Sequence, residues 1–196
     1  MLPVLLGYLA GSVPFAFLLA RRAGVDVRVS GSGNVGAANV FRTTGAWRGV
    51  LVMLLDVAKG AAAVIVATLT ASGAAVPAVS GAAAIVGHIY PVWLRFHGGK
   101  GVAVAAGVFA VLAPVATVLA GTLFVAVIAS TRYISLGSVA ATVALPPLAW
   151  FSGAPLAVVQ VAAGSAALIV FRHRSNLRRL RAGTERRIRR RTIDAA

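Results

Sequence analysis

Three short segments of the sequence combine glycine with cations and neutral hydrogen-bond donors, a combination suited to binding phosphate. In the first segment, 30–42, glycines alternate with polar residues and an arginine closes the run. Glycine lets backbone N–H groups approach an anion closely, and a planar guanidinium can bind phosphate through two parallel hydrogen bonds. The candidate residues of this segment are Gly31, Gly33, Gly36, Ser32, Asn34, Asn39 and Arg42.

The glycines of this first segment also spell G-x-G-x-x-G, the pattern of a dinucleotide-binding loop. That fold needs a βαβ unit of about 30 residues with its own sheet. The segment is too short to form such a unit, and Asp56, the acid that would bind the ribose, lies inside an apolar stretch. We therefore reject a dinucleotide site. A flexible loop with an arginine that only fixes topology remains the alternative to a phosphate site.

The second segment places a lysine among glycines, in the order His97-Gly98-Gly99-Lys100-Gly101. It is not a Walker A motif, because that motif needs glycine in place of Leu94 and a hydroxyl residue in place of Gly101. A helix that starts at this point would add its dipole and open N–H groups to the lysine charge. The segment therefore predicts an anion site, with a simple glycine turn as the alternative.

The third segment follows the last apolar run and holds His173 and Asn176 among arginines. Residues three apart share one face of a helix, so these two side chains are expected to act together. A histidine at a membrane surface can orient or deprotonate a hydroxyl group, although it can also be a plain interfacial side chain. Glu185 is the only acid nearby, and we expect it to pair with an arginine.

Three further ionisable residues lie within apolar stretches, and we predict structural roles for them. Asp56 and Lys59 are one helical turn apart, and inside a membrane each needs a partner. His88 precedes Tyr90 and Pro91 near the end of another apolar run, where a lone histidine is most simply a satisfied core residue.

The composition excludes an ordinary soluble enzyme, a coiled coil and a disordered chain. Of the 196 residues, 59% are hydrophobic and 12% are charged, against about 25% charged in soluble proteins. The absence of cysteine excludes disulfides and thiolate metal sites. The net charge of +15 comes from cations that long apolar runs separate, without interleaved aromatic residues, so we predict positive-inside topology and contact with anionic groups rather than nucleic acid.

These features predict an all-α integral membrane protein with seven transmembrane helices, an outer N-terminus and a cytoplasmic C-terminus. A single domain is expected over 1–196, with a basic tail from about residue 172. A single helix over the uncharged run 101–131 would be too long for a bilayer and would put the basic tail outside, so we expect a turn at Pro114. The predicted spans are 1–20, 49–69, 76–94, two short spans within 101–131 and two within 133–171 that separate at 151–155.

Taken together, several motifs resemble one family, the bacterial membrane glycerol-3-phosphate acyltransferases that use acyl phosphate as donor (PlsY). The resemblance covers nearly the whole chain, and its specificity comes from the joint order of the motifs. The family usually has threonine where Ala38 and Val104 stand. The matching motifs are Gly11-Ser12-Val13-Pro14, the run from Ser32 to Arg42, Asp56-Val57-Ala58-Lys59-Gly60, Gly87-His88-Ile89-Tyr90-Pro91, Gly98-Gly99-Lys100-Gly101-Val102-Ala103, His173-Arg174-Ser175-Asn176 and Gly183-Thr184-Glu185.

The resemblance implies seven membrane helices, an active site at the cytoplasmic face of a bacterial cell membrane, and no cofactor or metal. It implies acyl transfer from acyl phosphate to the 1-hydroxyl of sn-glycerol 3-phosphate, giving lysophosphatidate and phosphate. We assign Ser32, Arg42 and Lys100, with the glycines of their loops, to the two phosphates, and His173 and Asn176 to the glycerol end. The base is open between His173 and a donor phosphate oxygen, and the resemblance favours the second. We expect membrane lipid to surround the protein, and its oligomeric state stays open.

Other classes remain as alternatives or are disfavoured. A transporter or binding protein for an organic phosphate would share the apolar spans and anion loops, but would show paired repeats and broken helices at mid-membrane. A scaffold whose arginine tail binds anionic lipid would leave the glycine loops unexplained. The acyltransferases with an H-x-x-x-x-D pair are disfavoured, because no histidine here has aspartate four or five residues on.

Overall fold

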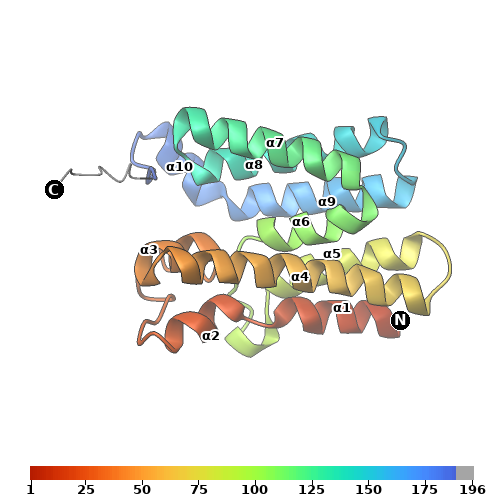
Figure 1. Cartoon of the computed structure of the whole chain (residues 1–196), viewed down its shortest axis with the longest axis horizontal. Helices are drawn as coiled ribbons and strands as arrows, with labels where there is room; N and C mark the ends of the chain where they lie inside the picture. Colours follow the sequence, from red (N-terminus) through yellow and green to blue (C-terminus); the bar gives the residue numbers. More distant parts are fainter. Residues whose placement is uncertain (189–196) are drawn as a thin grey trace.

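The computed structural model describes residues 1–188, and every regular element in this part of the chain is a helix (Figure 1). This confirms the predicted all-α class. The three arginines 189–191 of the predicted basic tail lie outside the described residues.

The first apolar run forms a broken helix rather than a continuous one. Helix α1 (Leu2–Ser12) ends before Val13, and α2 (Phe15–Arg21) begins after Pro14. Proline has no N–H group to donate, and its ring disfavours helical geometry in the preceding residue, so the helix is interrupted at Val13 and Pro14. The break leaves backbone carbonyl groups without helical partners inside the bundle.

A loop over 22–36 leads to the short helix α3 (Ala37–Thr44) and then to the long helix α4 (Ala46–Thr70). Helix α5 (Ala75–Ile89) returns and stops before Pro91, after which a short 3-10 turn, η1 (Val92–Leu94), begins the loop that contains Lys100. The α-helix thus ends at Ile89, but with η1 the stretch Ala75–Leu94 is long and apolar enough to cross a membrane, as predicted for 76–94.

The remaining apolar runs divide at the predicted breaks. Helix α6 (Val102–Leu112) is separated from α7 (Pro114–Thr131) by Ala113 alone, and α8 (Ile134–Phe151) from α9 (Leu156–Arg172) by a turn at 152–155. Helix α10 (Arg174–Arg181) follows α9 at a bend of 56°. With 11 residues α6 is about 16 Å long, against about 27 Å for the 18 residues of α7. Helix α6 is thus about 10 Å shorter than α7, and its start is set back from the neighbouring end of α7 (Figure 1).

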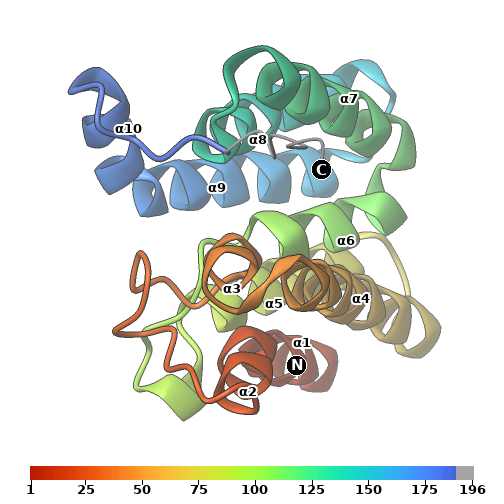
Figure 2. The same cartoon turned by 60° about the vertical axis from the view of Figure 1, so that its left-hand side comes forward.

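Helices α1 to α5 form one group and α7 to α9 another, with α6 between them (Figures 1 and 2). The closest packing joins α4 to α6 and α1 to α5. At the first contact, a Cβ atom on Gly107 would overlap the carbonyl oxygen of Val57; at the second, one on Gly11 would overlap the backbone of Ala84. Small residues at helix contacts let backbones approach closely, as is usual inside membranes.

Five helical stretches of the described chain are long and apolar enough to cross a membrane, and the bent pair α9–α10 makes a sixth. Helix α6 is apolar but shorter. The N-terminus lies at one end of the bundle, and α3 and α10 lie at the other (Figure 1). The loops at the N-terminal end, 71–74 and 152–155, carry no charge, whereas the arginines lie at the end with α3 and α10.

Candidate active site

The turn before Lys100 folds back onto the end of α5. The N–H of Gly98 donates to the carbonyl of Ile89, and the N–H of Gly99 donates to that of His88, both at 3.1 Å. A Cβ atom on Gly98 would overlap the His88 carbonyl oxygen. These glycines are therefore needed for close backbone approach. Their amides are already in use within the chain, unlike the open anion donors expected from the sequence.

Lys100 comes next and points toward α10, where its ammonium group donates to the Oδ1 atom of Asn176. Gly101 adopts a left-handed conformation with φ of 90° and starts α6, whose first turn has no side-chain cap. Lys100 and an open helix N-terminus thus lie side by side. Burial lowers the pKa of Lys100 to about 8, because it disfavours the charged form and the attraction of Glu185 only partly offsets it.

His173 lies at the bend between α9 and α10 and is buried. Its Nδ1 atom is 2.8 Å from the carbonyl oxygen of Ile169, which can only accept, so Nδ1 carries the proton and Nε2 keeps its lone pair. Burial, with the charge of Lys100, lowers the pKa of His173 to about 4. The imidazole is therefore neutral near pH 7 and presents one acceptor nitrogen.

Glu185 is the centre of a network that ties α10 to α8. Its Oε1 atom accepts from Asn176 Nδ2 at 2.6 Å and from the hydroxyl of Ser135 at 2.8 Å. Its Oε2 atom accepts from Arg179 Nε at 2.7 Å. Burial alone would raise the pKa of Glu185, but these hydrogen bonds outweigh it and lower the pKa below its ordinary value. The ionised carboxylate fixes the Asn176 amide, which in turn holds Lys100.

The first glycine segment is organised by the buried side chain of Asn39. Its Oδ1 atom accepts from the N–H of Ser32 at 2.9 Å, and its Nδ2 atom donates to the carbonyls of Val27 and Ser30 at 3.0 Å. The side chain of Asn39 thus holds the loop itself. The N–H groups of Gly33 and Gly36 also donate within the loop, to Ser30 and Asn34. The exposed Ser32 and the half-buried Asn34 stay at its surface.

All three segments meet at the end of the bundle that holds α3 and α10. The carbonyl oxygen of Val35 is 2.8 Å from where a Cβ atom of Gly99 would lie. The charge of Arg42, on α3, acts on Lys100 and on Glu185. Between the other two segments, Arg172 donates to the carbonyls of Gly98 at 3.3 Å and Gly99 at 3.4 Å. The result is a cluster of cations around one buried histidine.

Sequence reasoning did not single out Arg172, Ser135, Arg179 or Arg186. Arg172, at the end of a span, reads as a topology signal, but its guanidinium contacts the glycine turn and lies 5.5 Å from the Tyr90 ring centroid. Ser135 gives no signal because its partner is 50 residues away. Arg186 donates to the carbonyl of Gly31 at 3.1 Å and so joins the tail to the first loop.

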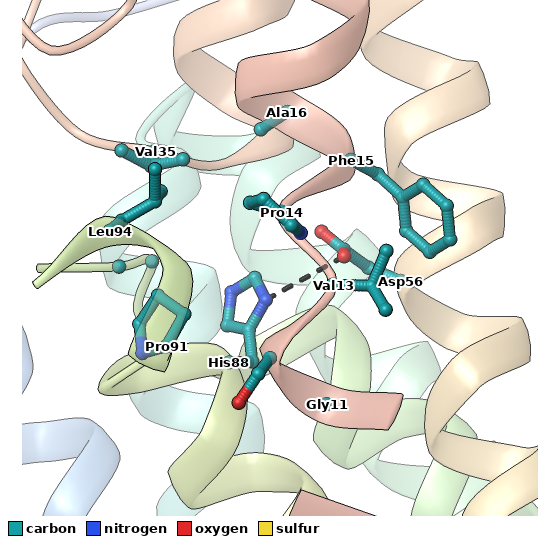
Figure 3. Close-up of a pocket in the computed structure, with 13 residues that line it drawn as sticks. Gly11, Val13, Pro14, Phe15, Ala16, Val35, Asp56, His88, Pro91 and Leu94 are labelled. Carbon is teal, nitrogen blue, oxygen red and sulfur yellow. Dashed lines mark ion pairs between the residues drawn. The ribbon is translucent and has the colours of Figure 1, made fainter. Parts of the chain in front are cut away.

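Asp56, Lys59 and His88 form a separate buried group on the other side of the glycine turn. Lys59 Nζ is 2.8 Å from Asp56 Oδ1 and 3.1 Å from His88 Nδ1. Asp56 and His88 line a small pocket together with Gly98, Gly99 and residues of the α1–α2 break (Figure 3). The group shares the turn with the cation cluster but none of its hydrogen bonds.

The chain is similar to known proteins over nearly its whole length. Residues 1–183 match the family model described as glycerol-3-phosphate acyltransferase. The chain is 45% identical to the glycerol-3-phosphate acyltransferase of Geobacter sulfurreducens, over 92% of this chain and 93% of that one. It is 48% identical to that of Myxococcus xanthus, over 94% and 97%.

Two solved structures of one enzyme share the fold. They are crystal structures of PlsY, an integral membrane glycerol 3-phosphate acyltransferase, in a glycerol 3-phosphate form and a lysophosphatidic acid form. The first has a TM-score of 0.92 at 39% identity, and the second has 0.90 at 38%. Each alignment covers 96% of this chain and 94% of the other.

Proposed function

The chain belongs to the glycerol-3-phosphate acyltransferase family, and we propose that it transfers a fatty acyl group from acyl phosphate to the 1-hydroxyl of sn-glycerol 3-phosphate. The products are lysophosphatidate and inorganic phosphate. The observation that carries this proposal is the meeting of the three segments, which places a neutral histidine, an amide and several cations in one cluster beside apolar helices.

The proposed setting is a bacterial cytoplasmic membrane that the chain crosses seven times, as one domain with its N-terminus outside. Two features support this topology. The N-terminus and α10 lie at opposite ends of the bundle, which requires an odd number of crossings (Figure 1). The arginines of the described chain lie at the α10 end, as the positive-inside rule expects of a cytoplasmic face.

Cations and a helix end, rather than glycine amides, are the proposed phosphate ligands. Lys100 and Arg42 supply positive charge, the open first turn of α6 after Gly101 supplies N–H groups, and Ser32 and Asn34 supply polar groups from the first loop. Four glycines are proposed to shape the loops rather than to bind phosphate, because their own N–H groups already donate to carbonyl groups of the chain: Gly33, Gly36, Gly98 and Gly99.

The acceptor hydroxyl is proposed to donate a hydrogen bond to His173 Nε2, with Asn176 beside it. A histidine whose pKa is about 4 is a weak base near pH 7, so its proposed task is orientation. The hydroxyl oxygen attacks the acyl carbonyl carbon, and its proton passes to an oxygen of the donor phosphate. The bond between the carbonyl carbon and the phosphate oxygen then breaks, and phosphate leaves.

Phosphate is a good leaving group from this mixed anhydride, so positioning and charge stabilisation are the main catalytic tasks. The two positions where the family usually has threonine fit this scheme. Val104 is fully buried and packs against Gly60 of α4, so no hydroxyl is lost from the cluster there. Ala38 lies in the first turn of α3, close to the loop.

The decisive test gives the purified chain acyl phosphate and labelled glycerol 3-phosphate. We expect labelled lysophosphatidate and one equivalent of phosphate. Lys100→Ala should raise the KM for glycerol 3-phosphate by about tenfold or more, because a charge-assisted contact contributes about 1.5–3 kcal/mol. An unchanged KM in the folded variant would remove Lys100 from the site. Uptake of glycerol 3-phosphate into proteoliposomes without acyl transfer would instead support a transporter.

A further inference from the structure

Lys59 is buried at the centre of the α1–α5 group and has three polar partners. Its ammonium nitrogen is 2.8 Å from Asp56 Oδ1, 2.8 Å from the carbonyl oxygen of Val13 and 3.1 Å from His88 Nδ1. The Phe15 ring centroid lies 5.5 Å away. The contacts with Val13 and His88 are hydrogen bonds, and the contact with Asp56 is an ion pair.

The three partners belong to three different elements. Asp56 lies on α4, Val13 is the residue at the α1–α2 break, and His88 lies in the last turn of α5. Lys59, itself on α4, therefore links α4 to the break in the first span and to the end of α5. A simple ion pair within α4 would need only the first of these contacts.

His88 contacts both Lys59 and the glycine turn, and so links the two. Lys59 donates to Nδ1, so the imidazole proton lies on Nε2; the alternative, donation from Nδ1 to Asp56, would span 3.6 Å. A Cβ atom on Gly99 would overlap Nε2, and the Gly99 N–H donates to the His88 carbonyl. The imidazole and backbone of His88 thus form the surface on which Gly99 rests.

Gly99 is directly followed by Lys100, and Lys100 reaches Asn176 on the far side of the turn. The pocket beside Pro14 shows the same arrangement, with Asp56 and His88 pointing toward each other next to the break in the first span (Figure 3). A continuous series of contacts therefore runs from Lys59 through His88 and Gly99 to Lys100.

We propose that Lys59, Asp56 and His88 are positioning residues for the transferase, and that they act by holding the Gly98–Gly99 turn so that Lys100 meets the acceptor phosphate. This inference rests on the proposed function, because it needs Lys100 to bind glycerol 3-phosphate. It assigns the buried group a role in substrate affinity, beyond holding the helices together.

The test is a double-mutant cycle on the dissociation constant of glycerol 3-phosphate, measured with the full purified chain and no donor. Dose-dependent thermal stabilisation extends the measurement to weak binding. The variants are His88→Asn, Lys100→Gln and the two combined. Asparagine ends near the position of Nδ1 and so keeps a partner for Lys59, but it does not reach Gly99.

Ser80→Ala is the matched control. Ser80 is buried on the same helix as His88 and bonds to the carbonyls of Pro3 and Ala63, remote from the turn. This control should lose thermal stability without any change in affinity. The kinetic readout is also specific: His88→Asn should raise the KM for glycerol 3-phosphate and leave the KM for acyl phosphate within about twofold.

We expect His88→Asn to weaken binding roughly tenfold in the wild-type chain and less than about twofold in the Lys100→Gln chain, since coupled residues are non-additive. Equal weakening in both chains, or none in the wild type, would overturn the positioning role. Normal binding by Lys100→Gln alone would instead contradict the proposed site, and no binding by the wild type would contradict the proposed function.

A second variant tests the same proposal if the His88→Asn protein does not fold. Asp56→Asn combined with Lys59→Gln removes both buried charges together, so neither is left without its counter-charge. It releases His88 Nδ1 from the ammonium group while keeping amide hydrogen bonds available. The same loss of affinity is expected, again only where Lys100 is present, and wild-type affinity in this folded variant would overturn the proposal.

Discussion

At the level of single residues, the ionisation states of Lys100 and His173 determine the pH dependence that we expect of the proposed site. His173 is buried and Lys100 is half-buried, both beside other cations, and the pKa falls to about 8 for Lys100 and to about 4 for His173. Lys100 is therefore charged at neutral pH but loses its proton in mildly alkaline solution. His173 is neutral from about pH 6 upward.

The first prediction concerns Lys100. Its charged form predominates below pH 8 and its neutral form above, so the KM for glycerol 3-phosphate should rise by up to about tenfold per pH unit above pH 8. Bound phosphate raises this pKa, so kcat should change less than KM. Lys100→Arg is the control, because arginine keeps its charge and should give a KM that stays level up to pH 10. A wild-type KM that is level from pH 7 to 9.5 would contradict the assignment.

The second prediction concerns His173. Glutamine can place a polar group near Nε2 but cannot take up a proton. If His173 only orients the hydroxyl, His173→Gln should keep a measurable fraction of turnover, and the wild-type rate should show no histidine ionisation between pH 6 and 8. Steady-state rates across this range test both points. A variant that binds both substrates normally and has no turnover would identify His173 as the base.

At the level of elements, prolines and glycines made the helix breaks predictable, whereas contacts between distant segments were not. The turn at Pro114 and the break at 151–155 follow from local chemistry and from the charge rule. The α1–α2 break was missed, because a proline within an apolar run is also tolerated in membrane helices. The occupied amides of Gly98 and Gly99 depend on α5 carbonyls, whose placement no local pattern reveals.

In the candidate site, too, the chemistry of single segments was predictable from the sequence, whereas the contacts between segments were not. The residue types in the three segments suggested phosphate and hydroxyl chemistry, and in the structure Asn176 bonds to both Lys100 and Glu185. Asn39 could not be told apart from a ligand by sequence, because a buried loop-organising amide and a phosphate-binding amide are the same residue type. Only its partners distinguish them.

A third prediction addresses the bend between α9 and α10. His173 and Asn176 lie one turn apart there, and both are buried. If both side chains bind the same acceptor molecule, removing either side chain misplaces the acceptor. The remaining side chain then contributes little to binding or turnover. The effects of His173→Gln and Asn176→Ala on kcat/KM should therefore combine to clearly less than the product of the single effects. Multiplicative losses in the double variant would show independent roles.

A fourth prediction addresses the contact between α4 and α6. Gly107→Ala should lower the thermal unfolding midpoint in detergent, because the added methyl group overlaps the Val57 carbonyl. Gly121→Ala on α7 is the matched control: nothing lies within 4 Å of its new methyl group, so stability should be unchanged or slightly higher. Similar midpoints for the two variants would show that the backbones do not pack this closely.

At the level of the whole molecule, two helix groups meet around α6, and both contribute loops to the proposed site at the α10 end. The α1–α5 group supplies Arg42, and the α7–α10 group supplies His173 and Asn176. The bonds of Arg172 and Arg186 to glycine carbonyls join the two groups at this end. In the proposed topology, the loss of a single crossing between Arg42 and His173 would place these residues on opposite sides of the membrane.

The fifth prediction tests that topology. The chain has no cysteine, so single cysteines can be labelled without background. A cysteine at Ser152 should react with a membrane-impermeant maleimide from outside the cell, and one at the exposed Thr184 only after the cytoplasmic face is opened. Labelling of residue 152 from inside alone would rule out the seven-span arrangement.

The shortness of α6 has a thermodynamic consequence for donor and product. Because α6 is about 10 Å shorter than α7, the proposed phosphate site at the start of α6 lies closer to the middle of the bundle than the end of α7 does. Drawing ten methylene groups of an acyl chain into water would cost about 8 kcal/mol. If the proposed site is reached from the bilayer, it avoids that cost, and we expect the donor to load and lysophosphatidate to leave by lateral diffusion within one leaflet.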